Sequence, residues 1–409
     1  MFRQILPVAA LLFGSGLLMF AGGMNGLILP VRGGAEGFSP LALGALGTGW
    51  ALGYVAGCLS MARLVGRVGH VRAFGVMAAM AAVAVLLSLL FIDAVVWIVL
   101  RAVSGFCFAG AAMIVESWLS ERVDARSRGT VFGVYTMVNL LSTTAGQVSL
   151  SLGDPMGYAL FVFPAVVYCL ALIPTAVSAS PAPAPLVSVQ LDLVSLWRNS
   201  PVAVAAVLAV GIANGAFGTL APVYADREGL SVTYVTLFVS VPLLAGALAQ
   251  IPLGLISDRV DRRKLLIGLA LAALCAAGTF ILVDPDTRGA NIALGAMFGA
   301  AIFTMYPVIV AHANDHAKRG SEIQVAAGLL MVFGIGSIIG PALAGGLMTT
   351  LGNGALFAVT GAAHVAIVLF TVLRIALSPP VPSEEKVDTP RVAVMGVSTP
   401  ETTACLLYT

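Results

Sequence analysis

Long apolar runs alternate with short polar breaks along almost the whole chain. Twelve apolar segments can be drawn, and most reach the roughly 20 residues that a helix needs to cross a bilayer. In lipid, a helix satisfies its own backbone hydrogen bonds, so the pattern predicts an all-α integral membrane protein. The predicted segments are Ile5–Leu29, Pro40–Ala62, His70–Ile92, Ala94–Leu119, Ser127–Leu152, Met156–Ser178, Pro201–Val223, Ser231–Ser257, Arg262–Val283, Arg288–His312, Glu322–Thr350 and Asn353–Leu373.

The longest internal polar break separates the sixth segment from the seventh. It contains the run Pro181–Pro185, in which proline and alanine alternate, and proline-rich stretches act as extended spacers. The break predicts two six-helix bundles, at residues 1–178 and 201–376, joined by a cytoplasmic linker at 179–200. Residues 377–409 are polar and are predicted to be a disordered cytoplasmic tail.

The two halves resemble one another. Gly22–Gly26 in the first segment has a counterpart in Gly211–Gly215 of the seventh, each with asparagine as its fourth residue. The charged stretch Arg67–Arg72 corresponds to Arg259–Lys264. Repeats in the same order indicate a duplicated membrane protein. We therefore expect twelve transmembrane helices in two pseudo-symmetric six-helix bundles.

Composition excludes most soluble classes. The chain is 59% hydrophobic, with a mean hydropathy of +1.01, and a soluble fold of this length cannot bury so much apolar surface. The bilayer is therefore the expected partner, and a net charge of +2 gives no reason to expect nucleic acid. The five cysteines show no paired spacing, so neither a metal site nor a disulfide framework is indicated. We predict no cofactor.

Lysine and arginine are distributed unevenly between the two sides of the predicted helices. With the N-terminus inside, 17 of the 21 fall in inner loops or tails and three in outer loops. Cytoplasmic loops carry such an excess. The sequence thus predicts that both termini are cytoplasmic.

Away from the segment ends, two charged residues lie clearly inside a predicted helix. Arg101 and Glu116 both belong to the fourth segment, where an ionisable side chain is costly and normally faces the bundle interior. Their spacing is about 22 Å along a helix, so they cannot pair, but both can face one cavity. Arg101 could hold an anionic group of a substrate or pair structurally. Glu116 could carry a proton or pair with a cytoplasmic arginine.

The loop between the eighth and ninth segments concentrates charge. It resembles the loop motif Gly-x-x-x-Asp-Arg-x-Gly/Asp-Arg-Arg of the major facilitator superfamily. The positions that match are Gly254, Asp258, Arg259, Asp261, Arg262 and Arg263. The earlier copy is degraded: Gly66 stands where the motif has aspartate, although Arg67, Gly69 and Arg72 remain.

A narrower resemblance is to the bacterial YcaD-like subfamily. It rests on Glu116–Leu119, Arg128-Gly129 and Tyr135, and on Tyr306-Pro307 followed by Ala313–Asp315. It implies a location in the bacterial inner membrane and leaves the substrate open.

The family resemblance implies a function. It implies a monomeric secondary active transporter, not an enzyme, that moves a small organic solute by alternating access and could be coupled to protons. Alternatives are a transporter-like receptor or scaffold, and a drug/proton antiporter. The resemblance places Asn25, Asn214 and Tyr306 beside the central cavity, together with Arg101. It makes the two charged loops a cytoplasmic latch, formed by Asp258, Arg259, Asp261, Arg262, Arg263, Arg67 and Arg72.

His312, Asp315 and His316 could be mistaken for a metal triad, because the two histidines lie one helical turn apart. They also fall where the tenth segment enters a cytoplasmic loop. We interpret them as a solvated polar cluster beside the gate.

Overall fold

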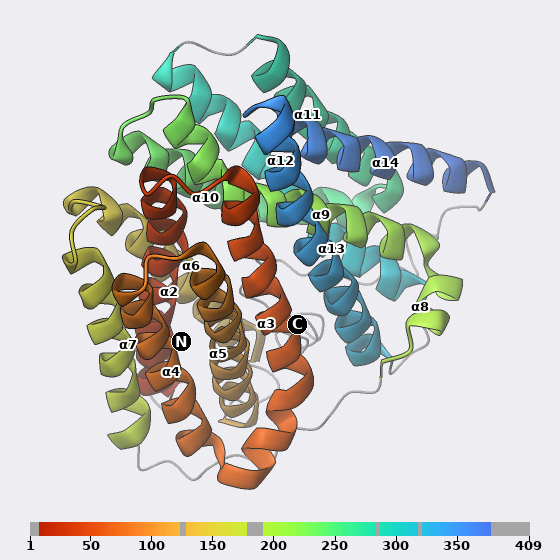
Figure 1. Cartoon of the computed structure of the whole chain (residues 1–409). Coiled ribbons are helices and arrows are strands. Elements are labelled where there is room, and N and C mark those ends of the chain that lie inside the picture. Colours follow the sequence, from red (N-terminus) through yellow and green to blue (C-terminus); the bar gives the residue numbers. More distant parts are fainter. Residues whose placement is uncertain (1–7, 123–127, 178–190, 284–286, 318–320, 378–409) are drawn as a thin grey trace.

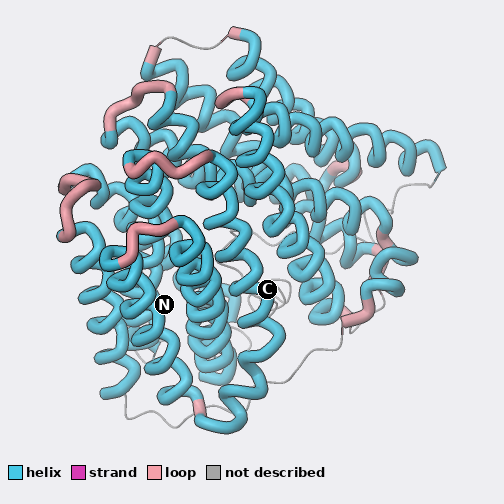
Figure 2. Tube along the Cα trace, viewed as in Figure 1, coloured by secondary structure: helices cyan, strands magenta, loops and turns pink. Residues whose placement is uncertain are grey.

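The computed structural model describes residues 8–122, 128–177, 191–283, 287–317 and 321–377. Within these ranges the chain is helical, with short loops between the helices (Figure 2). The first bundle contains α2 (Ala9–Ala35), α3 (Pro40–Val68), α4 (His70–Leu90), α5 (Ala94–Arg122), α6 (Arg128–Ser149) with the short 3-10 helix η2 (Leu150–Leu152), and α7 (Ala159–Val177). The second contains α9 (Pro201–Arg227), α10 (Val232–Arg259), α11 (Arg262–Leu282), α12 (Arg288–Asp315), α13 (Glu322–Leu351) and α14 (Ala355–Leu377).

Eleven of the described helices are long and apolar enough to cross a membrane. The remaining long helix, α6, has 22 residues, which is roughly 33 Å of helix and enough for a span. Buried polar side chains such as Thr136, Asn139 and Thr144 make it less apolar. These side chains face the protein rather than lipid, so α6 completes the expected set of twelve.

The two bundles repeat one packing pattern (Figure 1). In the first, α2 packs against α6 and α7, α3 against α5, and α4 against α5 and α7. In the second, α9 packs against α13 and α14, α10 against α12, and α11 against α12 and α14. Each pairing has its counterpart when α2–α7 are matched in order with α9–α14. The predicted pseudo-symmetric pair of six-helix bundles is confirmed.

The two bundles meet mainly along α3 and α13, with α6 against α10 and α2 against α9. Three hydrogen bonds between the bundles lie towards one end. Thr48 Oγ1 donates to Ile338 O at 2.8 Å, the Leu41 amide donates to Thr349 Oγ1 at 3.2 Å, and Ser240 Oγ donates to Gln147 Oε1 at 3.1 Å. In Figure 1, α3 and α13 lie side by side at that end and separate towards the other. That closed end carries the loop between α2 and α3, which the charge distribution predicts to be outside.

The first predicted boundary was wrong. The prediction ended the first helix at Leu29, yet α2 continues through the buried Pro30 to Ala35. Proline is tolerated in membrane helices where neighbouring groups satisfy the freed backbone. Arg32, expected in an outer loop, is therefore helical: its Nε lies 2.7 Å from Glu36 Oε1, and its Nη1 donates to Pro155 O at 3.2 Å.

The predicted linker and tail lie largely outside the described residues. Residues 178–190 and 378–409 are not described, and the described part of the linker forms the short helix α8 (Leu193–Asn199). Asp192 caps α8 by accepting a hydrogen bond from the Ser195 amide at 2.9 Å. The domain limits in the sequence remain a prediction.

Candidate functional site

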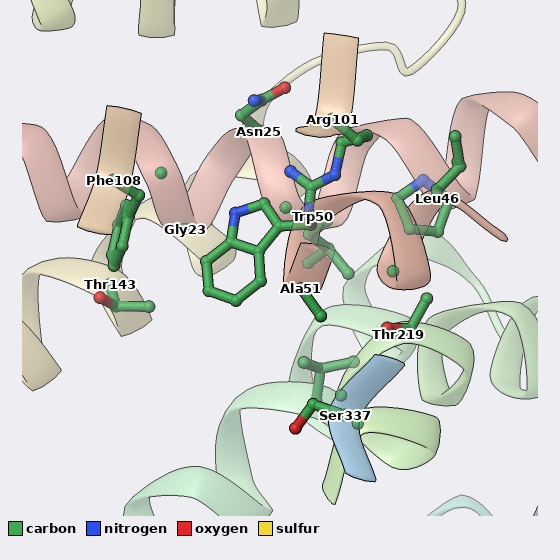
Figure 3. Close-up of a pocket in the computed structure, with 18 of the residues that line it drawn as sticks. Gly23, Asn25, Leu46, Trp50, Ala51, Arg101, Phe108, Thr143, Thr219 and Ser337 are labelled. Atoms are coloured by element: carbon green, nitrogen blue, oxygen red, sulfur yellow. The ribbon is translucent and has the colours of Figure 1, made fainter. Parts of the chain in front are cut away.

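A cavity of about 280 Å³ lies between the two bundles. The first bundle contributes residues of α2, α3, α5, α6 and α7 to its wall, and the second contributes residues of α9, α10, α12 and α13. Figure 3 shows side chains from both bundles turned towards this space. The cavity therefore depends on how the bundles are placed relative to one another.

The two predicted asparagines both line the cavity. Asn25 comes from α2 and Asn214 from α9, and they are 2% and 8% exposed. The Asn25 side chain lies near the Tyr168 hydroxyl. Its Oδ1 has no hydrogen-bond partner, and neither does either amide atom of Asn214. Buried polar groups normally have partners. These two amides are positioned to bond a molecule in the cavity.

Arg101 also lines the cavity, as predicted. Its guanidinium carbon lies 6.0 Å from the centre of the Trp50 ring, within range of a cation–π interaction, and Figure 3 shows the two side chains next to each other. Within the described part of the chain Arg101 makes no ion pair. A cation thus faces the cavity with a ring beside it and no paired carboxylate.

Glu116 does not share the cavity with Arg101, so the expectation that both face one space was wrong. It is fully buried inside the first bundle and is not part of the cavity wall. The Tyr135 hydroxyl donates to Glu116 Oε1 at 3.1 Å. The azimuth on an ideal helix was compatible with one cavity, but Tyr135 of α6 and Tyr54 of α3 lie close to the carboxylate, which is buried within the first bundle.

Aromatic stacking connects the two charges indirectly. The rings of Trp50 and Tyr54, one turn apart on α3, stack with centroids 5.1 Å apart. Tyr54 in turn lies close enough to Glu116 to be affected by its charge. Arg101, Trp50 and Tyr54 therefore lead from the cavity towards Glu116 in the first bundle.

Tyr306 does not line the cavity in this structure. It is completely buried on α12, and its ring packs edge-on against that of Phe333, with centroids 5.9 Å apart. Phe333 is part of the cavity wall. Tyr306 supports the wall from behind rather than reaching the cavity.

The charged loop between α10 and α11 forms a cluster within the second bundle. Arg262, almost fully buried, lies between two carboxylates: its Nη2 is 3.6 Å from Asp258 Oδ1, and its Nε is 3.3 Å from Asp315 Oδ2. Asp261 is the N-cap of α11 and accepts hydrogen bonds from the Arg263 amide at 3.0 Å and from Arg263 Nε at 3.1 Å. We call Asp258, Asp261, Arg262, Arg263 and Asp315 the charge cluster.

Burial alone would raise the pKa of Asp261, but the hydrogen bonds and the charge of Arg263 outweigh it, and the pKa falls below its ordinary value. Asp261 is therefore a charged N-cap whose contribution depends on ionisation.

The remaining latch candidates behave differently. Arg67, Arg72 and Arg259 are exposed and make no ion pair with the described residues. His312 and His316 lie next to the charge cluster, with ring centroids 4.7 Å apart, and His316 Nδ1 lies 2.9 Å from His312 O. Asp315, the third member of the supposed triad, turns to Arg262 instead.

The sequence reasoning did not select several residues of the cavity wall. Trp50, Phe108, Tyr168, Phe217 and Phe303 all line it. Aromatic residues within apolar segments carry no signal that separates cavity from core. Beside Trp50 the helices α3 and α5 pack closely, because a Cβ at Gly53 or Gly105 would collide with a backbone carbonyl of the neighbouring helix.

The chain is similar in sequence to known proteins over most of its length. Over 384 residues the chain is 25% identical to an uncharacterized MFS-type transporter of Enterobacter sp. (strain 638), covering 92% of this chain and 97% of that protein. It is 25% identical over 357 residues to the uncharacterized MFS-type transporter YcaD of Escherichia coli O7:K1, covering 86% and 91%. With an uncharacterized MFS-type transporter of Yersinia pestis it shares 27% over 377 residues, covering 89% and 94%.

Solved structures share the fold at low sequence identity. The nucleoside transporter NupG superposes with a TM-score of 0.76 at 11% identity, covering 90% of this chain and 98% of that one. A D-xylose-proton symporter gives 0.67 at 15% identity, covering 93% and 99%. Residues 11–330 match the Major Facilitator Superfamily. Since that match extends over most of both bundles, the chain belongs to the Major Facilitator Superfamily of transporters.

Proposed function

We propose that the cavity between the bundles is the solute site of an alternating-access transporter. The observation that carries the proposal is that one set of buried, unpartnered polar atoms, on Asn25 and Asn214, comes from equivalent positions of the two bundles. A solute bound to both asparagines would contact both moving parts. Rocking of one bundle against the other would then expose the solute to either side of the membrane.

The orientation is part of the proposal. The lysine and arginine bias supports cytoplasmic termini, and relatives from bacteria support a bacterial inner membrane. The closed end would then face outwards and the cavity would open to the cytoplasm. One chain supplies all of the cavity wall, which supports a monomer as the transport unit.

Cysteine labelling tests alternating access. In a variant without its native cysteines, Asn25→Cys and Asn214→Cys should react with membrane-impermeant thiol reagents added to either side of sealed vesicles. Ala273→Cys is the matched control, because Ala273 on α11 is fully buried inside the second bundle and outside the cavity wall. It should not be labelled. If neither asparagine position reacts from either side, the transport proposal is wrong. A function as a receptor or scaffold is then the better interpretation.

We further propose that the charge cluster belongs to the cytoplasmic gate. In this structure its ion pairs join α10, α11 and α12 of the second bundle, and the exposed Arg67 and Arg72 lie on the corresponding loop of the first. The same cysteine-labelling experiment also tests the role of the charge cluster in the gate. Asp258→Ala should increase labelling of the cavity cysteines from the cytoplasmic side, and unchanged labelling would leave the loop with a topological role only.

Proton coupling through Glu116 is the final part of the proposal. The carboxylate is fully buried, accepts a hydrogen bond from Tyr135 and borders the row of aromatic rings that reaches Arg101. Protonation would remove a buried charge. A change at the solute site could favour or oppose that protonation through Trp50 and Tyr54.

A further inference from the structure

The described wall of the cavity carries a single positive charge and no negative one. Among the residues that form its wall, Arg101 is the only one with an ionisable acidic or basic group that is charged at neutral pH. A guanidinium stays protonated in proteins. The rest of the polar wall is neutral: Asn25, Ser104, Thr143, Gln147, Tyr168, Asn214, Thr219 and Ser337. Within the described wall, no carboxylate compensates the positive charge.

The guanidinium of Arg101 faces the cavity and is not neutralised by a carboxylate among the described residues. Arg101 makes no ion pair with the described residues, and the Trp50 ring and Tyr168 lie near its guanidinium. An uncompensated cation in a low-dielectric interior attracts anions strongly. The planar guanidinium suits bidentate contact with a carboxylate. The first recognition element is therefore a single anionic group.

Neutral polar atoms provide a second recognition element. Thr143 Oγ1 lies in the cavity wall without a hydrogen-bond partner, as do Asn25 Oδ1 and both amide atoms of Asn214. Asn214, which is 8% exposed, belongs to the second bundle, whereas Arg101 belongs to the first. A ligand that reaches both must carry a hydrogen-bonding group at a distance from its anionic group.

Between these polar elements the wall is aromatic. Trp50, Phe108 and Tyr168 come from the first bundle, and Phe217, Phe303 and Phe333 come from the second. Aromatic side chains provide large apolar contact surfaces and stack on planar groups. The volume of about 280 Å³ lies at the lower limit for small-molecule sites, so the ligand must be small.

We propose that the cavity takes a small organic monoanion with an aromatic or other apolar body and a second, neutral hydrogen-bonding group. Its carboxylate, or another singly charged oxyanion, binds Arg101. Its body packs among the aromatic side chains, and its neutral group reaches Asn214. This substrate class rests on the proposed transport function, and it disfavours the cationic drugs expected of a drug/proton antiporter, because Arg101 repels them.

Matched ligand triplets test the charge requirement. Each triplet joins one body to a carboxylate, an amide or an amine: 4-hydroxyphenylacetate, 4-hydroxyphenylacetamide and tyramine form one, and indole-3-acetate, indole-3-acetamide and tryptamine another. Acetate tests the need for a body. Purified protein in a neutral detergent is assayed by thermal shift and equilibrium binding. The aromatic carboxylates should bind and raise the unfolding temperature, and the amides, amines and acetate should not.

Variants separate recognition from folding. Arg101→Gln should weaken carboxylate binding by about tenfold to 100-fold, since hydrogen bonds to charged groups are among the stronger ones. Arg101→Lys should keep part of the affinity. The unliganded unfolding temperature of Arg101→Gln should be unchanged or higher, because the substitution removes an unpaired charge. Arg288→Gln is the matched control: Arg288 also lies over a ring, 4.8 Å from Tyr234, but it is exposed and outside the cavity wall.

Three results would overturn the substrate class. These are amides or amines that bind as well as the carboxylates, carboxylate binding that Arg101→Gln leaves intact, and a panel in which no carboxylate binds at millimolar concentration. A fall in the unliganded unfolding temperature of Arg101→Gln would assign Arg101 a structural role instead. If the cavity cysteines still react from both sides in such a case, the transporter proposal stands and only the substrate class fails.

Discussion

Glu116 shows how one buried carboxylate is stabilised and what it could do. Its hydrogen bond from Tyr135 is supported by a second pair on the same bundle, in which Ser15 Oγ donates to Asn139 Oδ1 at 2.8 Å. Tyr135 also interacts with both Ser15 and Asn139. Such networks hold a buried polar group in one geometry. They also give a proton a set of neighbouring oxygen atoms.

Glu116→Gln should therefore uncouple transport from the proton gradient. The amide keeps the size of the side chain but cannot ionise, so exchange of solute across proteoliposome membranes should persist while accumulation driven by an imposed pH gradient is lost. Tyr135→Phe is the companion variant, because it removes the hydrogen bond and keeps the carboxylate; it should retain gradient-driven accumulation at a reduced rate. Accumulation by Glu116→Gln equal to that of the unmodified protein would exclude Glu116 as the proton carrier.

At the scale of elements, Asp261 holds the turn between α10 and α11 in its conformation. Asp261 is the N-cap of α11 and accepts hydrogen bonds from both the amide and the side chain of Arg263. Its backbone oxygen accepts from Lys264 and Leu265 as well, at 2.9 and 3.2 Å. The turn that carries the family motif is thus fixed by the N-cap of α11, and the next residue, Arg262, pairs with Asp315.

Two substitutions separate the N-cap hydrogen bond of Asp261 from the effect of its negative charge. Asp261→Ala should cost about 1 kcal/mol of stability, a typical value for loss of an N-cap, while Asp261→Asn keeps a capping oxygen and should cost less. Because the pKa of Asp261 is lowered in the folded protein, its ionic contribution is present above the ordinary aspartate pKa of about 3.9 and is lost as the pH falls through the folded value. Unfolding temperatures at neutral and acidic pH measure both effects.

The expected pattern is specific. The difference between Asp261→Asn and the unmodified protein should shrink on acidification, whereas the difference between the Asn and Ala variants should persist. A stability gap for Asp261→Asn that does not change with pH would show that the charge of Asp261 contributes nothing.

At the scale of the whole molecule, the contact between the bundles at the closed end is the feature on which transport depends. Ser240 of α10 and Gln147 of α6 form a hydrogen bond across it, and Thr48 of α3 reaches the backbone of α13. These contacts must break if the cavity is to open at that end. The close packing of α3 against α13 would have to separate as well.

A disulfide across this interface should stop the cycle. Oxidation of Gln147→Cys with Ser240→Cys, in a background without native cysteines, should abolish labelling of Asn214→Cys from the closed side and leave labelling from the other side intact; a reductant should restore it. The control pair is Glu228→Cys with Asn353→Cys. The native side chains of that pair bond at 2.8 Å, but both lie in the second bundle. If the control pair blocks labelling equally, or the first pair has no effect, rigid rocking about this interface is wrong.

The amino-acid sequence by itself determined the twelve helices, their pairing into two repeats and the equivalence of Asn25 and Asn214. Hydrophobic runs and repeated motifs are local features, and the bilayer converts them into helices with little ambiguity. Arg101 and the loop at Asp258 could be selected for a similar reason, since charge in a chain that is only 10% charged is informative wherever it occurs.

Tertiary structure alone decided which of these residues share a space. It placed Trp50 beside Arg101, enclosed Glu116 within the first bundle and put Tyr306 behind the cavity wall. It also paired Arg262 with Asp315. The rotation of each helix about its axis and the angle between the bundles fix these arrangements, and both follow from side-chain packing between segments distant in the sequence. Helical periodicity gives the face on which a residue lies, but the neighbouring helices determine what that face meets.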